Sequence, residues 1–193
     1  GAAVLENFFP TQTGARLRGG SKRHATVGAG LVESFINYRS GSTAKMFAAT
    51  NGDIYDVTLP TDPTVTPVAE VTGQTSNYYS HVQFATAGGE YVIAVNGDDL
   101  HWVYDGLTFE QNDPAITTTT SDNFSQVWSF KSRLFFVKKG TKTACYLPVD
   151  SIGGVAADFS LAGIFKRGGS LLFGATWSQD SGDGKDDLCV FVS

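Results

Sequence analysis

The sequence predicts an all-β protein built from repeated small antiparallel sheets. Val, Ile, Thr, Phe, Tyr and Trp, the residue types that suit a pleated sheet, make up 67 of the 193 residues. Four short apolar runs recur, and Asn-Gly, the strongest short-range signal for a tight hairpin turn, follows the first two. Charged residues make up only 17% and Gly numbers 22, which argues against a coiled coil and against an acidic disordered chain.

The apolar runs are expected to be the middle strands of a repeating unit. They are centred near Phe47, Val92, Phe135 and Cys189, at separations of 45, 43 and 54 residues. A β-rich stretch precedes each run, and a glycine turn and a third such stretch follow the first three. A strand–turn–strand–turn–strand unit of about 45 residues is typical of a β-propeller blade, which buries its faces by stacking on its neighbours.

We therefore predict an all-β fold with β-propeller-like blades, about three complete and one truncated, over residues 31–193. The approximate blades are 31–75, 76–120, 121–165 and 170–193. The last unit stops after its second strand, so we expect either that the chain is a piece of a longer polypeptide or that another segment or subunit completes this sheet. Two stacked sheets, a β-sandwich, are the alternative that short strands at this spacing also allow.

Two segments lie outside the repeat. Residues 1–30 are rich in Gly, Arg and Thr and are expected to form an extended arm that lies on the body or on a neighbouring molecule. Residues 153–169 are expected to form one short helix or a compact loop, because four apolar side chains have helical spacing there. These are Phe159, Leu161, Ile164 and Phe165.

Charge is unevenly distributed in this chain of net charge −5. Four of the 14 basic residues lie within eight positions, and the remainder carries 10 basic against 19 acidic side chains. The four are Arg16, Arg18, Lys22 and Arg23. An acidic surface does not hold duplex phosphate, so a sequence-reading DNA-binding domain is not expected. No apolar run approaches the roughly 18 residues of a membrane span, so we expect a soluble chain without membrane insertion.

No catalytic, cofactor-binding or metal site is expected. Asp180–Gly182 resembles the nucleophile loop of chymotrypsin-like proteases but lacks its flanking glycines, and its aspartates lack the spacing of a calcium loop. His81 and His101 have no carboxylate or cysteine at metal-ligand spacing. Cys145 and Cys189 are expected to be buried thiols. We therefore predict that the protein is not an enzyme and uses no cofactor.

Particular phrases of the sequence resemble bacteriophage and prophage virion proteins. They are Glu6–Pro10, Gly14–Ser21, Tyr104–Leu107, Lys131–Phe136, Tyr146–Val149, Phe159–Leu161 and Phe165–Ser170. In layout the chain is similar to the tail-hub and tail-nozzle proteins of short-tailed phages, whose full chains are far longer. The resemblance implies a β-propeller that assembles into a ring below the portal and adaptor, through which DNA leaves the virion.

The resemblance also implies location and partners. The protein would be a structural component of the virion tail, made in the cytoplasm of the bacterial host. Its expected partners are copies of itself, in a hexameric or dodecameric ring, and other tail or adaptor proteins, with DNA only as passing cargo. An acidic body suits this conduit, because each Lys or Arg contact with phosphate would slow the passage of DNA. Arg16, Arg18, Lys22 and Arg23 are then expected to contact an acidic neighbouring subunit.

Two other functions stay open at this point. A propeller-type module would bind carbohydrate or protein through its loops, with Trp102 or Trp128 on the binding face. A propeller hydrolase would need carboxylates that converge on a central channel, and Asp53, Asp98 and Asp99 are the candidates.

Overall fold

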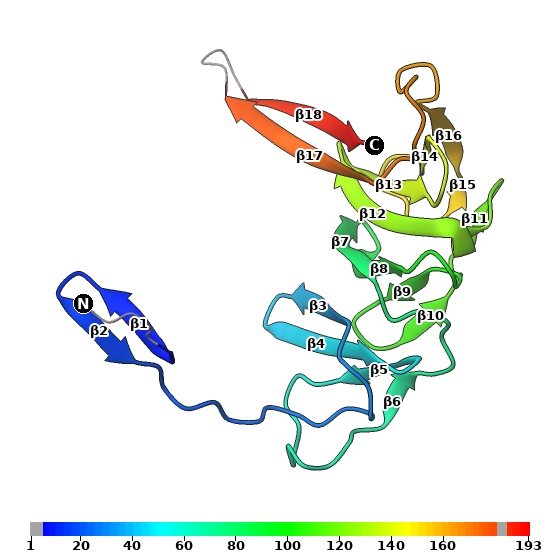
Figure 1. The fold of residues 1–193 in the computed structure, drawn as a ribbon. Coiled ribbons are helices and arrows are strands. Elements are labelled where there is room, and N and C mark those ends of the chain that lie inside the picture. Colours follow the sequence, from blue (N-terminus) through cyan, green and yellow to red (C-terminus); the bar gives the residue numbers. More distant parts are fainter. Residues whose placement is uncertain (1–5, 181–184) are drawn as a thin grey trace.

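The fold is all-β. In this computed structural model residues 6–180 and 185–193 are described, and they form several small sheets, most of them antiparallel (Figure 1). The described residues contain no α-helix and a single short 3-10 turn, η1 (Ser121–Asn123). The all-β prediction is therefore confirmed.

Three sheets have four strands each, arranged as antiparallel meanders in chain order. Sheet 1 contains β3 (Ser34–Ser40), β4 (Thr43–Thr50), β5 (Asp53–Asp56) and β6 (Ala69–Val71). Sheet 2 contains β7 (Ser80–Thr86), β8 (Gly89–Val95), β9 (Trp102–Tyr104) and β10 (Phe109–Gln111). Sheet 3 contains β12 (Phe124–Phe130), β13 (Arg133–Lys138), β14 (Thr143–Tyr146) and β16 (Ala157–Ser160).

The remaining strands form three smaller sheets of two strands each in the described part of the chain. Sheet 4 is the antiparallel pair β17 (Phe173–Asp180) and β18 (Lys185–Val192). The hairpin of β1 (Phe8–Thr11) and β2 (Gly14–Leu17) lies in the N-terminal arm. A short parallel pair joins β11 (Ile116–Thr117) to β15 (Gly154–Val155).

Turn chemistry explains some of the strand boundaries and corrects others. Asn51 and Gly52 have φ values of 53° and 84° and connect β4 to β5 as a two-residue turn, as predicted. Asn96–Gly97 instead opens a longer connection, because the Asn96 side-chain oxygen accepts the N–H groups of Asp98 and Asp99. The connection from β12 to β13 is a two-residue turn at Lys131–Ser132, both with positive φ, which the sequence did not signal.

Apolar side chains fill the spaces between successive sheets. Between sheets 1 and 2 lie Ile36, Phe47, Ile54, Val92 and Tyr104. Between sheets 2 and 3 lie Phe84, Ile93, Phe124, Leu134 and Phe136. Between sheets 3 and 4 lie Trp128, Val137, Leu161, Leu171 and Phe191. Each of the two middle sheets is therefore covered on both faces, which explains the near-continuous apolar runs in β8 and β13.

The first strands of the four sheets lie side by side in the order β3, β7, β12, β17 (Figure 1). At each junction one side chain accepts a backbone N–H of the next sheet. The Ser34 hydroxyl accepts Tyr79 N–H at 2.8 Å, and the Ser80 hydroxyl accepts Val127 N–H at 3.2 Å. The Gln126 carboxamide accepts Gly174 N–H at 2.7 Å and donates to Gly174 O at 2.8 Å. The predicted units are thus separate sheets packed in series, not strands interleaved in two layers.

The segment 153–169 is not helical. Its Ala157–Ser160 part is β16, the fourth strand of sheet 3, paired with β14. After it, a single turn closes through Phe165 N–H to Leu161 O at 3.0 Å and leaves Ile164 exposed. The helix alternative was wrong because Phe159, the first of the four apolar residues, pairs with β14 as part of an edge strand, and a compact loop follows from Leu161.

Connections at the outer ends of the sheets differ in length. Residues 57–68 join the third and fourth strands of sheet 1, whereas residues 105–108 make the same connection in sheet 2. Asp62 fixes one bend of the longer connection, since its side chain accepts the N–H and the hydroxyl of Thr64. These bonds lower the pKa of the exposed Asp62 carboxyl. The N-terminal arm contacts this longer connection.

Candidate interaction surface

The N-terminal arm begins with a hairpin that stands away from the sheets (Figure 1). Every residue of β1 and β2 is exposed. Phe8 pairs with Leu17, and Phe9 pairs with Arg16, whose guanidinium lies 5.7 Å from the Phe9 ring centroid. The expected arm over 1–30 therefore contains a defined β-hairpin, which composition did not reveal.

Two hydrogen bonds fix the following part of the arm to the outer face of sheet 1. His24 Nε2 lies 2.6 Å from Val57 O, and the Thr26 hydroxyl donates to Pro63 O at 2.7 Å. Ala25 and Val27 pack against Ala48, Tyr55 and Val57, all three buried. Burial and the hydrogen bond to Asp53 raise the pKa of Tyr55. The arm is thus attached at residues 24–27, and the hairpin precedes this attachment.

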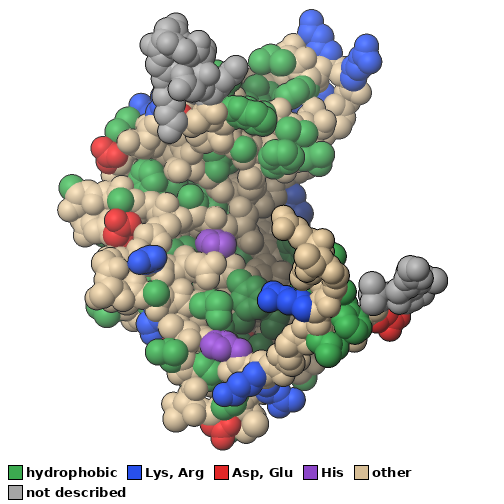
Figure 2. Space-filling view, turned by 90° about the vertical axis from the view of Figure 1, so that its left-hand side faces the viewer, with side chains coloured by type: hydrophobic (Ala, Val, Ile, Leu, Met, Phe, Trp, Pro, Cys, Tyr) green, Lys and Arg blue, Asp and Glu red, His purple; other side chains and the backbone are tan. Residues whose placement is uncertain are grey.

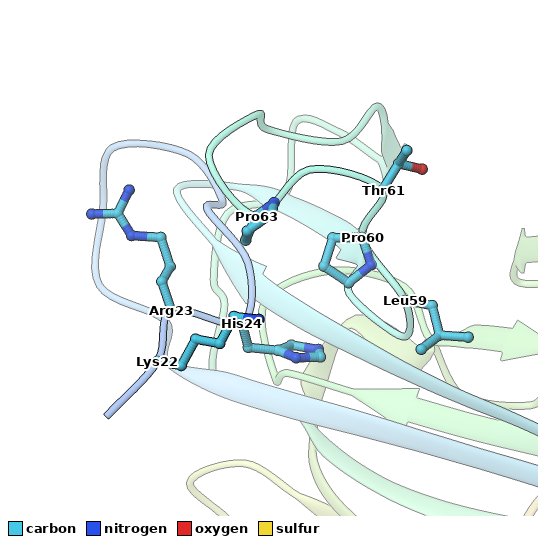
Figure 3. Close-up of a pocket in the computed structure, with 7 residues that line it drawn as sticks. All are labelled: Lys22, Arg23, His24, Leu59, Pro60, Thr61 and Pro63. Atoms are coloured by element: carbon cyan, nitrogen blue, oxygen red, sulfur yellow. The ribbon is translucent and has the colours of Figure 1, made fainter. Parts of the chain in front are cut away.

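A pocket of about 460 Å³ lies where the arm crosses the loop of residues 57–68 (Figure 3). Its lining residues are Lys22, Arg23, His24, Leu59, Pro60, Thr61 and Pro63. Figure 3 shows the Arg23 side chain directed away from Pro60 and Leu59, and His24 turned toward the sheet. The pocket therefore combines a cationic rim with an apolar wall.

The structure separates the four predicted contact residues into two pairs. Arg16 and Arg18 belong to the hairpin, where Arg18 N–H closes the ladder onto Asn7 O at 2.7 Å. Lys22 and Arg23 lie at the pocket. All four are exposed, and none has a carboxylate within 4.0 Å among the residues that the structure describes. These cations are therefore available to an anionic partner.

Beside the pocket, sheet 1 carries an apolar groove of about 420 Å³. The arm lines one part of the groove, and Phe35, which is 53% exposed, lines the other. The lining residues are Arg23, His24, Ala25, Val27, Val32, Phe35, Met46, Ala48 and Val57. Figure 2 shows hydrophobic side chains exposed beside the arm and a notch between the arm and the upper part of the molecule. Sequence reasoning missed this groove, although the continuous apolar run Met46–Ala49 in β4 indicates that both faces of the strand are covered.

The fourth sheet has a similar unpartnered face. Cross-strand pairing puts six apolar residues on the side away from sheet 3: Phe173, Ala175, Trp177, Leu188, Val190 and Val192. Trp177 is 63% exposed and Leu188 is 48% exposed. We call this set the outer face of sheet 4. In the sequence, Phe173, Ala175 and Trp177 alternate with Gly174 and Thr176, which indicates an apolar face on this strand.

The tryptophans proposed for a glycan-binding face lie in different surroundings. Trp128 is buried between sheets 3 and 4 and stacks on Phe135. Trp102 is half-buried and donates its Nε1–H to Gln74 at 2.9 Å. Two other side chains of these types are exposed instead, Trp177 and Tyr78.

The three candidate hydrolase carboxylates are held by neighbours of their own. Asp53 accepts the Tyr55 hydroxyl at 2.9 Å, and Asp98 forms an ion pair of 2.7 Å with Lys139. Asp99 accepts the Asn96 amide at 2.7 Å and the Thr75 N–H at 2.8 Å. Burial raises the pKa of Asp99, but these hydrogen bonds outweigh it, so the net pKa lies below the ordinary value. Each carboxylate therefore has a local structural role.

The histidines and cysteines also lie in packed positions. The Cys145 thiol is buried, as predicted, and burial raises its pKa to about 12. Cys189 is half-buried, and burial raises its pKa too. His81 Nε2 accepts Asn37 N–H at 3.5 Å, and burial lowers the pKa of His81.

His101 predicts a pH dependence of stability. Its Nδ1 lies 2.8 Å from the Ser121 hydroxyl, and burial lowers its pKa from 6.5 to about 4. Because the unfolded chain binds the proton more readily, this histidine stabilises the fold above pH 6.5, and the contribution is lost as the pH falls toward 4. Between pH 7 and pH 5 the loss is about 2 kcal/mol, measurable by urea unfolding.

The variant His101→Asn should reduce this dependence over the same interval, and the remainder should come from His81, whose pKa burial also lowers. A wild-type stability that is constant from pH 7 to pH 5 would contradict the assignment. Carboxyl groups change the free energy of unfolding little between pH 7 and pH 5, because they titrate mainly below pH 5.

Ser181, Gly182 and Asp183 of the protease-like loop lie outside the described residues. Within residues 6–180 and 185–193, no group of three or more His, Cys, Asp or Glu side chains is placed to hold a metal ion, and no helix has the length and apolar character to cross a bilayer. Comparisons of the chain with protein-family models, with curated proteins and with solved structures gave no match.

Proposed function

We propose that this chain is a structural component of a phage tail, of the hub or nozzle type, and that its sheets are the blades of a β-propeller. The observation that carries the proposal is the row of first strands β3, β7, β12 and β17, connected at each junction by hydrogen bonds between side chains and backbone. Blades around a channel pack in this way, each on the next. The tail assignment follows from the resemblance of the sequence phrases to phage virion proteins.

In this function, copies of the chain form a hexameric or dodecameric ring with tail and adaptor proteins, and DNA passes as cargo. A net charge of −5 favours passage, since the surface offers phosphate little attraction. Arg16 and Arg18 lie on the projecting hairpin, whereas Lys22 and Arg23 lie at the pocket on the body, so an acidic neighbour would contact both pairs. The chain would act in the virion after synthesis in the bacterial cytoplasm.

A charge-reversal series tests the assembly. The variant Arg16→Glu/Arg18→Glu/Lys22→Glu/Arg23→Glu should lose self-association and binding to tail partners, because four attractions become repulsions. Light scattering after size exclusion measures the mass, and negative-stain images report ring symmetry. Sixfold or twelvefold rings of the protein without substitutions would support the proposal.

The matched control is Arg39→Glu/Lys131→Glu/Lys166→Glu/Arg167→Glu, which changes the net charge equally at other exposed sites. It should assemble like the parent. Loss of assembly in both variants would indicate a general charge effect, and a parent protein that stays monomeric would contradict the ring.

A carbohydrate- or protein-binding module is the second candidate, and the exposed Trp177 is the observation that favours it. If the protein binds glycans and Trp177→Ala abolishes this binding without affecting assembly, the result would favour the binding module over the tail component.

A further inference from the structure

We propose that Asn51 is a site of spontaneous deamidation in the folded protein, that Asn96 is protected from the same reaction, and that Asn77 controls the rate at Asn51. The inference is independent of the proposed function, because it depends only on contacts within sheets 1 and 2 and the segment between them. It assigns a covalent modification to the turn that joins β4 to β5.

The reaction needs no enzyme and no cofactor. The Gly52 N–H gives its proton to a base, and the Gly52 nitrogen attacks Cγ of the Asn51 side chain. The bond from Cγ to Nδ2 breaks, and ammonia leaves with a proton from solvent. Water then opens the cyclic imide at one of its two carbonyls, which yields aspartate or isoaspartate. Glycine at the second position favours the attack, because it has no Cβ atom to hinder the nitrogen.

The chain contains the Asn-Gly dipeptide twice, in nearly identical sequence. Each dipeptide follows a β-branched residue and precedes an aspartate, in Thr50–Asp53 and in Val95–Asp98. The two asparagines are therefore expected to react at similar rates in the unfolded chain. A difference between their rates in the folded protein then arises from the fold.

The Asn96 side chain is held through both of its polar atoms. Its Nδ2 donates to Ser76 O at 2.9 Å and to the Asp99 carboxylate at 2.7 Å. Its Oδ1 accepts the N–H groups of Asp98 and Asp99 at 3.1 Å and 2.8 Å. Asn96 is also buried, with 7% of its surface exposed. Attack on its Cγ would require rotation of the carboxamide out of these four hydrogen bonds, so the fold protects Asn96.

Asn51 differs in both respects. It is exposed, and its side chain forms no hydrogen bond with the residues that the structure describes. With a φ of 53°, it is the first residue of the two-residue turn between the paired residues Thr50 and Asp53. Its carboxamide can therefore rotate toward the Gly52 nitrogen without the loss of a side-chain hydrogen bond.

The Gly52 nitrogen is the part of this site that the fold restrains. Its N–H donates to Asn77 Oδ1 at 2.8 Å, and Gly52 O accepts the Gln74 N–H at 2.8 Å. Asn77 and Gln74 both belong to the segment between β6 and β7, which thus covers one side of the turn. A base reaches a hydrogen-bonded amide proton only when the bond opens, so opening of the Asn77 contact limits the reaction at Asn51.

The product changes the turn itself. Isoaspartate routes the main chain through Cβ and adds one carbon atom to a turn whose length fixes the pairing of β4 with β5. The two positive φ values of Asn51 and Gly52 no longer define the connection. We expect the amides of β5 to exchange faster in the modified protein, because the ladder is weakened at this end.

The first experiment compares the two asparagines within one sample. The full chain is incubated in mildly alkaline buffer, and peptide mass spectrometry detects the exchange of the side-chain NH₂ for OH. In the folded protein we expect Asn51 to react at least tenfold faster than Asn96, and in denaturing urea we expect the two rates to converge. The inference is overturned if Asn96 reacts as fast as Asn51 in the folded protein, or if neither residue reacts.

The second experiment tests the control by Asn77. Asn77→Ala removes the acceptor of the Gly52 N–H and should accelerate the reaction at Asn51 at least threefold, with Asn96 unchanged. Asn77→Asp keeps an acceptor oxygen and should react at the rate of the unsubstituted protein. Equal rates at Asn51 in all three proteins would overturn the control by Asn77. So would equal acceleration at Asn51 and Asn96 in Asn77→Ala, since it would show a general loss of structure.

Discussion

Phe136→Ala should lower the free energy of unfolding by about 3–5 kcal/mol. Phe136 lies in β13, has no exposed surface and stacks on Phe124 with ring centroids 4.6 Å apart. The substitution removes apolar surface and leaves a cavity between sheets 2 and 3, which two rigid sheets cannot close by moving together. For a chain of this size, the melting temperature should fall by about 10 °C.

Calorimetry or circular dichroism checks this value. Phe9→Ala is the matched control, since Phe9 lies in the hairpin and is 49% exposed, and it should change stability by less than about 0.5 kcal/mol. Equal effects of the two substitutions would mean that the space between sheets 2 and 3 is not the core.

Gly174→Ala should detach sheet 4 from sheet 3. A Cβ atom at Gly174 would lie 2.4 Å from two atoms of the Trp128 indole ring, Cη2 and Cζ2. Trp128 cannot give way easily, because it packs against Phe135 and Phe191. The shift would also break the two hydrogen bonds between Gly174 and Gln126, so the cost is about 1–3 kcal/mol, concentrated on the last sheet.

Hydrogen exchange measures this local effect. Amides of β17 and β18 should exchange at least tenfold faster in Gly174→Ala, while those of β4 and β8 keep their rates. Gly163→Ala is the control, because no atom lies within 4 Å of a Cβ at that turn position. Uniform acceleration in all sheets would contradict a local detachment.

The repeating sheets were predictable because their signals are local. Runs such as Tyr91–Val95 and Arg133–Lys138 are short, apolar and bounded by turn residues, and the structure places each as the second strand of a sheet. The fourth strands were harder to predict. β6, β10 and β16 have three or four residues and mixed polarity, because each is an edge strand that needs pairing on one side alone.

The candidate surface was only partly predictable. The cluster of Arg16, Arg18, Lys22 and Arg23 is visible in the sequence, but its division between a hairpin and a pocket depends on where His24 and Thr26 attach to sheet 1. That attachment joins residues more than 30 positions apart. Local propensity carries no information on such contacts, and the same holds for the apolar groove.

The unequal connections at the outer ends of the sheets have a consequence for how such a chain can change over evolution. Residues 57–68 lengthen sheet 1 at a point that leaves its four-strand ladder intact, and a longer loop adds little entropic cost. A longer loop at this end of a sheet therefore costs little stability. The loop of residues 57–68 already forms the side of the pocket that faces the arm. Variation in rim length is a simple route by which related chains could acquire new attachment specificity without altering their scaffold.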